Sequence, residues 1–277
     1  MRFLFVLLFP AYFLLTPVSE EKPVFLLQQM QDSIKKIRTL KMKIAALERI
    51  EKTFVSARSE IKLQTSPHRL YFVNKEKKLE ILFDATVDKE KALVKPHVFP
   101  YVSMWLDPRG GLMRKNQHYT INELGFGFIG NSILLTIRKD PEGIKNFKFH
   151  GKVQKNGINC YLIEYENKDY GYIDYTVGAH ETATTIAYKL IVNDYLLRYR
   201  NNLLNEFGFL KKGTVIKVPN LYCRKAVIWL EEKRLLPISL SLYDDVGLFE
   251  SYEFADIHVN PVLTDYDFSK KNREYNF

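Results

Sequence analysis

The feature that most constrains the fold is an alternation of apolar and polar residues, which recurs along most of the chain. Between Lys41 and about Lys115 it appears in short runs at 60–64, 69–73 and 79–83. Turn-forming residues such as Ser66-Pro67 separate these runs. Because the connections leave little room for crossover helices, the runs predict an antiparallel meander. The 17 Tyr and 19 Phe residues also favour strands over a helical bundle.

The same alternation returns after Pro141. Runs at 147–154 and 158–166 flank Asn156-Gly157, a strong hairpin signal, and further runs lie at 226–231, 237–243 and 247–259. Residues 172–221 have a different pattern, with two short helical stretches at 182–190 and 193–201 between strand-like ends. We therefore predict an α+β chain in which 172–221 is inserted between two neighbouring strands of one twisted sheet.

Two longer helices are predicted beside the sheet. Apolar residues recur at helical spacing over 24–40, which indicates an amphipathic helix that covers either the sheet or a membrane surface. A second helix over 121–138 begins at a capping box formed by Thr120 and Glu123. It contains Gly125-Phe126-Gly127-Phe128-Ile129-Gly130, a literal match to the dinucleotide-binding pattern. Since that pattern requires a strand before the glycines, we interpret them as allowing close packing against the sheet.

The N-terminus predicts export. Arg2 is followed by an apolar run from Phe3 to Leu15 and a polar stretch beginning at Ser19, which is typical of a signal peptide over residues 1–19. No A-x-A cleavage pattern precedes Ser19, so an uncleaved N-terminal anchor, and membrane association through it, remains an alternative. The net charge of +9 suits an anionic partner. Export makes phospholipid headgroups or acidic wall polymers the expected partners and excludes nucleic acid.

The two cysteines, Cys160 and Cys223, both lie in strand-like runs. An exported protein permits a disulfide. Antiparallel pairing would separate the two residues, so we expect two buried thiols.

The inserted segment carries a first family resemblance. The matching residues are Tyr175-x-Val177, Thr182, Ile186-Ala187, Leu190, Asn201, Leu210, Gly213, Ile216 and Val218-Pro219. Together they resemble a LysM domain, a module that binds N-acetylglucosamine-containing glycans such as peptidoglycan. The resemblance places the ligand groove between the loops at 178–182 and 204–209. The implied glycan-binding residues are Gly178, Ala179, His180, Glu181, Thr182, Leu204, Asn205, Glu206 and Phe207.

One departure from the LysM pattern falls in the groove itself. His180-Glu181 stand where the family usually has Gly-Asp. A degenerate module, kept as a structural insert or a protein contact, is therefore the alternative.

The remaining sequence carries a second resemblance. An ordered series of short motifs at 228–230, 236–237, 243–247, 252–257, 260–261 and 267–268 is similar to the C-terminal half of LolA-like lipoprotein carriers. The resemblance implies that 24–171 and 222–268 form an incomplete antiparallel barrel, covered by helices, that can enclose acyl chains. The whole chain then resembles a bacterial family of exported domains of unknown function with a LysM-like insertion.

A carrier of this kind needs an apolar cavity on the concave side of the sheet. The candidate lining residues are Leu63, Tyr71, Phe83, Trp105, Phe126, Phe128, Trp229 and Leu240. The same side chains could equally fill a solid core.

Catalytic motifs are not evident. The six histidines are scattered, and H-E-x-x-H and G-x-S-x-G do not occur, so neither a metal nor another cofactor is predicted. The best candidates for a metal site or a hydrolytic pair are His97, Asp107 and His118, which flank one predicted strand and its turn. The primary hypothesis is a non-catalytic protein of the periplasm or cell envelope that binds lipid or lipoprotein and associates with peptidoglycan. The alternatives are a wall-active hydrolase targeted by the LysM-like module and a purely structural envelope protein.

Overall fold

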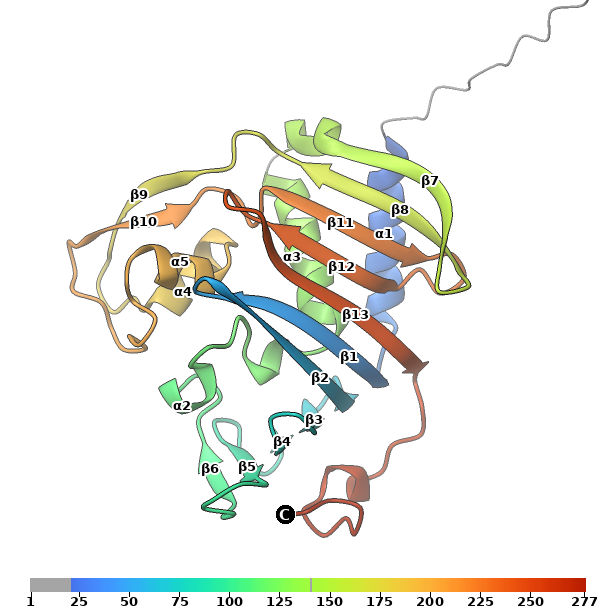
Figure 1. Cartoon of the computed structure of the whole chain (residues 1–277), viewed down its shortest axis with the longest axis vertical. Helices are drawn as coiled ribbons and strands as arrows, with labels where there is room; N and C mark the ends of the chain where they lie inside the picture. The colour runs from blue at the N-terminus through green and yellow to red at the C-terminus, as the bar shows by residue number, and fades with distance from the viewer. Residues whose placement is uncertain (1–20, 140) are drawn as a thin grey trace, which may run out of the picture.

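The alternating runs form one large, open antiparallel sheet (Figure 1). The computed structural model describes residues 21–139 and 141–277, so the predicted signal at 1–19 lies outside the described residues. The sheet has 11 strands in the order β6-β5-β4-β3-β2-β1-β13-β12-β11-β8-β7. Their bounds are β1 Thr39–Ile50, β2 Thr53–Gln64, β3 Arg69–Asn74, β4 Leu79–Asp84, β5 Ala92–Pro96, β6 Met104–Leu106, β7 Phe147–Lys155, β8 Ile158–Glu166, β11 Lys225–Glu231, β12 Pro237–Tyr243 and β13 Leu248–Val259.

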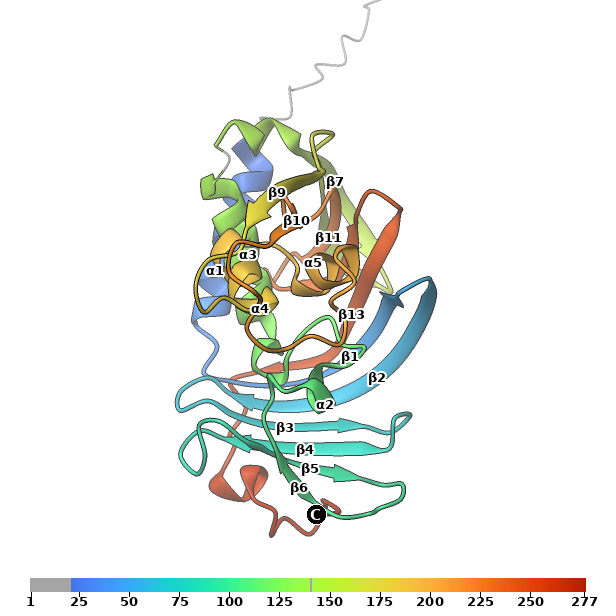
Figure 2. The same ribbon diagram turned by 90° about the vertical axis from the view of Figure 1, so that its left-hand side faces the viewer.

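The pairing of β1 with β13 joins the two ends of the chain at the middle of the sheet. The strands after β1 extend the sheet in one direction, and β13, β12, β11, β8 and β7 extend it in the other. Figure 2 shows that the sheet bends strongly along this order. The predicted α+β class and antiparallel meander are confirmed.

The alternation divides the side chains between an inner and an outer face of the sheet. In β1, Leu40, Met42 and Ile44 are buried on the inner face, and the intervening Lys41 and Lys43 are exposed. Successive side chains of a strand point to opposite faces, so this pattern alone determines which face can bury a core.

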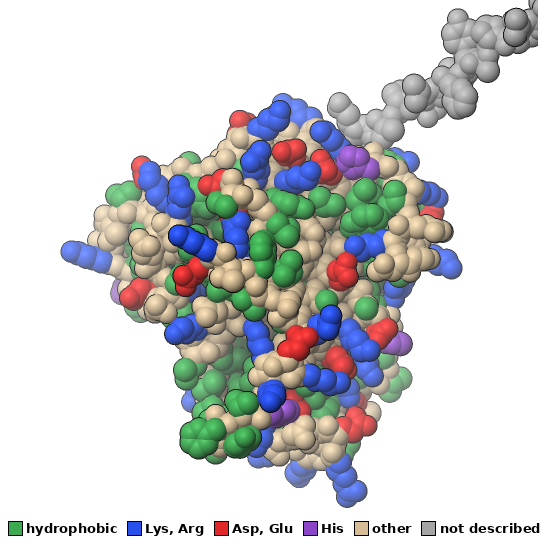
Figure 3. All heavy atoms as spheres, in the orientation of Figure 1, with side chains coloured by type: hydrophobic (Ala, Val, Ile, Leu, Met, Phe, Trp, Pro, Cys, Tyr) green, Lys and Arg blue, Asp and Glu red, His purple; other side chains and the backbone are tan. Residues whose placement is uncertain are grey.

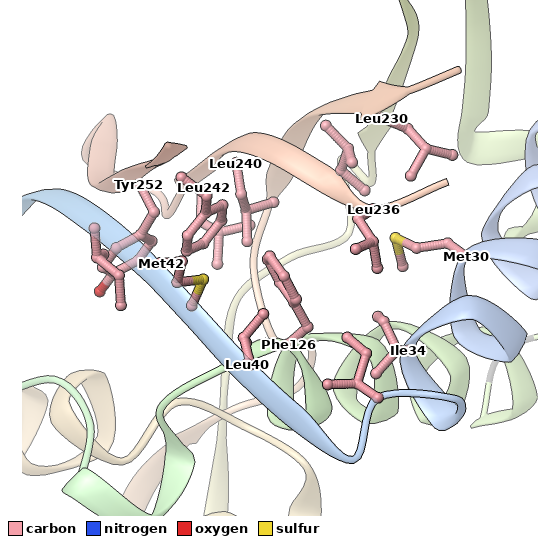
Figure 4. Close-up of a cluster of buried hydrophobic side chains, with 14 of the residues drawn as sticks. Met30, Ile34, Leu40, Met42, Phe126, Leu230, Leu236, Leu240, Leu242 and Tyr252 are labelled. Carbon is pink, nitrogen blue, oxygen red and sulfur yellow. The ribbon is translucent and has the colours of Figure 1, made fainter. Parts of the chain in front are cut away.

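Two helices cover the inner face, α1 (Glu21–Lys35) and α3 (Phe126–Lys139). Leu27 and Met30 of α1 are completely buried, so this helix covers the sheet. Figure 4 shows Met30, Ile34 and Phe126 directed from the helices toward Leu236 and Leu240 of the sheet region. These residues belong to the main hydrophobic core.

The predicted boundaries of both helices are wrong. The first helix ends at Lys35 rather than at 40, because residues from Thr39 onward pair with both β2 and β13. The second begins at Phe126 rather than at 121. The expected capping contact exists, with the Glu123 carboxylate accepting from the Thr120 amide at 2.5 Å, but it starts only the 3₁₀ turn η1 (Ile121–Glu123). Gly125, at φ +97°, interrupts the chain before α3.

Gly125 and Gly130 allow close packing, as the sequence indicated, with one addition. A Cβ on Gly125 would lie 2.8 Å from a Leu63 methyl of the sheet. A Cβ on Gly130 would collide with Gln31 and lie 2.9 Å from the Ile34 methyl, both on α1. Gly130 therefore sets the distance between the two helices, whereas Gly127 has open space beside it.

The segment between β8 and β11 leaves the sheet and returns to a neighbouring strand. It contains β9 (Tyr172–Thr176), α4 (Ala183–Leu190), α5 (Asp194–Arg200) and β10 (Val215–Pro219). β9 and β10 form a separate two-stranded antiparallel sheet. Ile186, Leu197 and Val218 are completely buried in a core that belongs to this unit alone. We refer to residues 172–221 as the insert.

Three further short helical turns are α2 (Gly111–Arg114), η2 (Pro141–Asn146) and η3 (Asp265–Phe268). The segment that follows η3 lies on the outer face of the sheet. Tyr275 stacks on Tyr71 with ring centroids 3.7 Å apart and covers Leu82 and Leu93. The outer face of β3, β4 and β5 is therefore buried too, beneath the C-terminal segment. Cys160 and Cys223 are both free and buried, as expected.

Candidate functional site

Two hollows lie on the inner face of the sheet. The α3 hollow has a cavity volume of about 50 Å³ and is bounded by α3 and by strands β8, β11 and β12. The larger β1–β5 hollow, of about 260 Å³, lies between the inner face of the N-terminal strands and the segment 112–124. The walls of the α3 hollow are almost entirely apolar and include Phe128, Ile133, Phe147, Ala226, Ile228, Leu240 and Leu242.

The β1–β5 hollow combines an apolar floor with a polar rim. Ala46 of β1 and Ala57 of β2 are direct cross-strand neighbours and both line it. Because their side chains are small, this part of the floor leaves space above the sheet. Lys77, Lys115 and Gln117 also border the hollow, so polar groups stand where it approaches solvent.

Tyr119 lines both hollows and therefore lies between them. Its hydroxyl contacts the Tyr222 hydroxyl at 2.8 Å and donates to the Glu250 carboxylate. Tyr222 lines the α3 hollow, whereas Tyr252 lines the β1–β5 hollow and donates to Glu48 at 2.6 Å. Burial raises the pKa of Tyr119 and Tyr252 well above the usual tyrosine value, so both remain protonated donors.

Glu250 is the centre of this buried polar cluster, with no exposed surface. One of its oxygens lies 2.6 Å from His118 Nδ1, and the His118 ring stacks on Phe249 with centroids 4.2 Å apart. His118 Nε2 lies 3.2 Å from the Arg49 carbonyl oxygen. Each polar atom here is used by a protein partner, so the cluster can hold the elements that meet around it, and it offers no open carboxylate to a substrate.

The predicted cavity residues are divided by the structure into three groups. Phe128 and Leu240 line the α3 hollow. Leu63, Phe83 and Phe126 are buried in the main core, where they fill space. The remaining three do not face the inner side.

Tyr71, Trp105 and Trp229 were wrong as cavity residues because each occupies an outward position in its strand. Tyr71 is covered by Tyr275. Trp105 is paired with Leu93 at the edge of the sheet and is 48% exposed. Trp229 lies between the inward Ile228 and Leu230 and has the Lys155 ammonium over its ring. Each of the three lies within a run of consecutive apolar residues, so the sequence pattern does not show which of them point inward.

The constellation His97, Asp107 and His118 is not assembled. His118 is buried with Glu250, His97 lies 3.3 Å from Glu80, and Asp107 accepts from the Arg109 amide at 2.8 Å. No hydrogen bond connects any two of the three. Within 21–139 and 141–277 no group of His, Cys, Asp and Glu side chains could hold a metal ion. In the same range no helix has the length and apolar character needed to cross a membrane.

The predicted glycan loops lie at one end of the insert. Glu181 accepts from the Gly178 amide at 2.7 Å and from the Tyr175 hydroxyl at 2.8 Å, and Lys189 donates to it at 3.0 Å. The hydrogen bond from Gly178 and those from Lys189 and Tyr175 lower the pKa of Glu181 to about 2. Glu181, one of the two residues that depart from the LysM pattern, therefore stabilises its own loop through these hydrogen bonds. Ala179, His180, Asn205 and Glu206 are exposed, and Thr182 caps α4.

The second glycan loop contacts the sheet domain. Leu204 packs in a small cluster with Tyr195 and with Phe249 of β13. Phe207 lies under the Arg198 guanidinium and against Gly111 of α2, where an added Cβ would be 3.1 Å from its ring. These two residues hold the insert in place. Sequence inspection gave no signal for this, because Gly111 and Phe207 are far apart along the chain.

Comparison with solved structures finds chains of similar length and low identity. LprF from Mycobacterium bovis is 11% identical with a TM-score of 0.42, covering 87% of this chain and 95% of that one. The lipoprotein LppX from Mycobacterium tuberculosis is 15% identical with a TM-score of 0.41, covering 87% and 98%. A LolA superfamily protein from Nitrosomonas europaea is 10% identical with a TM-score of 0.32, covering 88% and 97%. No curated protein matches the sequence.

A family profile matches most of the chain. It covers residues 38–175 and 210–277 and leaves out 176–209, the part of the insert that contains α4 and α5. The matched residues include every strand of the large sheet. The chain therefore belongs to the family described as protein of unknown function (DUF1571).

Proposed function

We propose that this chain is a non-catalytic protein of the cell envelope that binds a lipid or lipoprotein acyl chain in the two hollows on the inner face of its sheet. The observation that carries the proposal is the pair of hollows that share Tyr119, one almost entirely apolar and one apolar with a polar rim. Such a combination suits a ligand with a hydrocarbon body and a polar end. The sequence resemblance to LolA-like carriers supports the same ligand class.

A cavity-filling variant tests this proposal. Ala46→Phe adds a ring to the floor of the β1–β5 hollow, whereas Ala45→Phe adds the same ring on the opposite face of β1. We expect Ala46→Phe to weaken binding of a fluorescent long-chain fatty acid at least about tenfold, equivalent to roughly 1.4 kcal/mol of lost apolar contact. Ala45→Phe should bind like the unaltered chain. Equal binding by both variants, or purified protein from which solvent extracts no lipid, would contradict the proposal.

Export of the chain is part of the proposal and rests on the residues that precede the described fold. Arg2 and the apolar run to Leu15 support a signal, with an uncleaved anchor as the alternative. Intact-mass measurement of the protein recovered from its native envelope would distinguish the two. A mass that begins near Glu20 supports cleavage, a mass that includes Met1 supports the anchor, and recovery from the cytoplasm alone contradicts export.

Glycan binding by the insert is a second candidate function. It is favoured by the strand-helix-helix-strand order of the insert, by its separate core and by the exposed loop residues His180 and Asn205. The measurement is co-sedimentation of the full chain with purified peptidoglycan at physiological salt. We expect His180→Ala with Asn205→Ala to reduce the bound fraction and Val246→Ala, a matched exposed change outside the insert, to leave it unaltered. A full chain that stays in the supernatant would remove this candidate.

A further inference from the structure

An exposed apolar surface lies at the end of the sheet formed by β5 and β6. We call it the apolar tip and define it by Val98, Phe99, Tyr101, Val102, Trp105 and Leu112. Phe99 is 86% exposed, Leu112 83% and Tyr101 60%. From Val98 to Trp105 the chain contains no charged residue. Figure 3 shows apolar side chains gathered at the lower left, where β6 lies in Figure 1.

The loop that carries the apolar tip is held in a defined shape. The Tyr101 amide donates to the Val98 carbonyl at 2.8 Å, and the Lys95 ammonium donates to the Tyr101 carbonyl at 2.6 Å. The His97 amide donates to the Lys78 carbonyl at 2.7 Å and thereby fixes the loop to the β3–β4 turn. The aromatic side chains are therefore presented to solvent by ordered backbone. Exposed apolar side chains gathered at one end of a sheet in this way mark an interaction surface.

The β3–β4 turn, which the His97 amide joins to this loop, is net basic. Lys75, Lys77 and Lys78 are exposed on it together with Glu76, and Lys75 pairs with Glu60 at 3.1 Å. Lys77 and Lys115 border the β1–β5 hollow together with Leu112, which also belongs to the apolar tip. The surface thus combines aromatic and aliphatic side chains with a basic rim, and it adjoins the mouth of the larger hollow.

We propose that the apolar tip docks on the surface of an anionic phospholipid bilayer. Tyr and Trp are the residues that favour the membrane–water boundary, and lysines near it are attracted to acidic headgroups. The tip is made of protruding loops, which can enter a headgroup layer more readily than they can match a flat protein face. The edge strand β6 has 3 residues, which is too short to template a long strand-to-strand contact with a second copy. The proposal is independent of acyl-chain binding.

Vesicle co-sedimentation of the full chain tests the proposal. We expect binding to vesicles that contain phosphatidylglycerol and much weaker binding to phosphatidylcholine alone, with the difference decreasing as salt is raised. The variant Phe99→Ser/Val102→Ser/Trp105→Ser should partition at least about tenfold less into the anionic vesicles. The matched control Phe209→Ser/Val262→Ser removes side chains that are 72% and 92% exposed elsewhere and should bind like the unaltered chain.

A charge variant tests the basic rim, and a spectroscopic readout tests the aromatic part of the surface. Lys77→Glu/Lys78→Glu should reduce binding to the anionic vesicles and leave the residual binding to phosphatidylcholine unchanged. The chain has two tryptophans, so in the Trp229→Phe variant all tryptophan fluorescence comes from Trp105. Its emission should shift to shorter wavelength when anionic vesicles are added.

Three results would overturn the proposal. The first is an unaltered chain that does not sediment with anionic vesicles, and the second is equal binding by the triple variant. The third is a dimer in sedimentation velocity that the triple variant abolishes while vesicles bind neither protein, which would assign the apolar tip to a second copy of the chain. Unchanged far-ultraviolet circular dichroism of each variant is the check that it has folded.

Discussion

The helix pair α1 and α3 and the insert are held in place by different interactions. At the helix junction, α1 and α3 meet the inner face through Leu27, Met30 and Phe126, all completely or almost completely buried. At the insert junction, Arg114 of α2 forms an ion pair with Asp194 of α5, and both Arg114 and Arg198 are 1% exposed. The first junction can lose a methyl group and still pack, whereas the second contains charges that require their partners.

The insert junction also includes the buried polar cluster. The His118 ring lies between Glu250 and Tyr195 of α5, with its centroid 4.5 Å from that of Tyr195. The Tyr195 hydroxyl accepts from the Glu51 amide at 2.7 Å in the β1–β2 turn. Glu250 connects this junction to the hollows, because it bonds His118 on one side and Tyr119, which lines both hollows, on the other. A change at the insert junction is expected to alter both the seating of the insert and the shape of the hollows.

The largest expected effect is that of Glu250→Ala. It leaves His118 and Tyr119 buried without their acceptor, so we expect the free energy of unfolding to fall by about 3–5 kcal/mol. Glu253→Ala, on the same strand, removes a carboxylate that is 54% exposed and should change it by less than about 0.5 kcal/mol. Chemical denaturation of the two variants measures the difference. Adding His118→Phe to Glu250→Ala should restore part of the loss, and a double variant less stable than Glu250→Ala would refute this account.

A smaller effect is expected at the helix junction. Gly130→Ala places a Cβ against Gln31 and 2.9 Å from the Ile34 methyl, so we expect a loss of about 1–3 kcal/mol despite the better helix propensity of Ala. Gly127→Ala in the same helix meets nothing within 4 Å and should cause no loss. Thermal unfolding of both variants is the measurement. If Gly127→Ala proves the more harmful of the two, the helices are not limited by contact at Gly130.

The comparison also explains how much could be predicted from the sequence. The helix junction depends on spacing within one segment, so Leu27, Met30 and the glycines of α3 could be interpreted locally. The insert junction joins Arg114 to Asp194 and His118 to Glu250, and nothing near either residue indicates its partner. The sequence order therefore groups His118 with His97 and Asp107, which the structure does not bring together. Trp105 and Trp229 lie in runs of consecutive apolar residues, so their outward direction follows only from the strand pairing and not from the local pattern.

The smallest expected effect is a pH dependence of the insert junction that the helix junction lacks. Burial alone would lower the pKa of His118, but its hydrogen bond to Glu250 and the nearby Glu48 outweigh burial and raise the pKa above 6.5. A group whose pKa is raised on folding contributes stability that is fully present below its unfolded pKa and is lost as the pH rises through its folded pKa. The free energy of unfolding should therefore decrease as the pH is raised from about 6 to above the folded pKa of His118. His118→Phe should flatten this decrease, while Gly130→Ala should lower the whole curve without changing its slope. A slope that persists in His118→Phe would mean that another group titrates, and the difference between the two junctions would then not depend on this histidine.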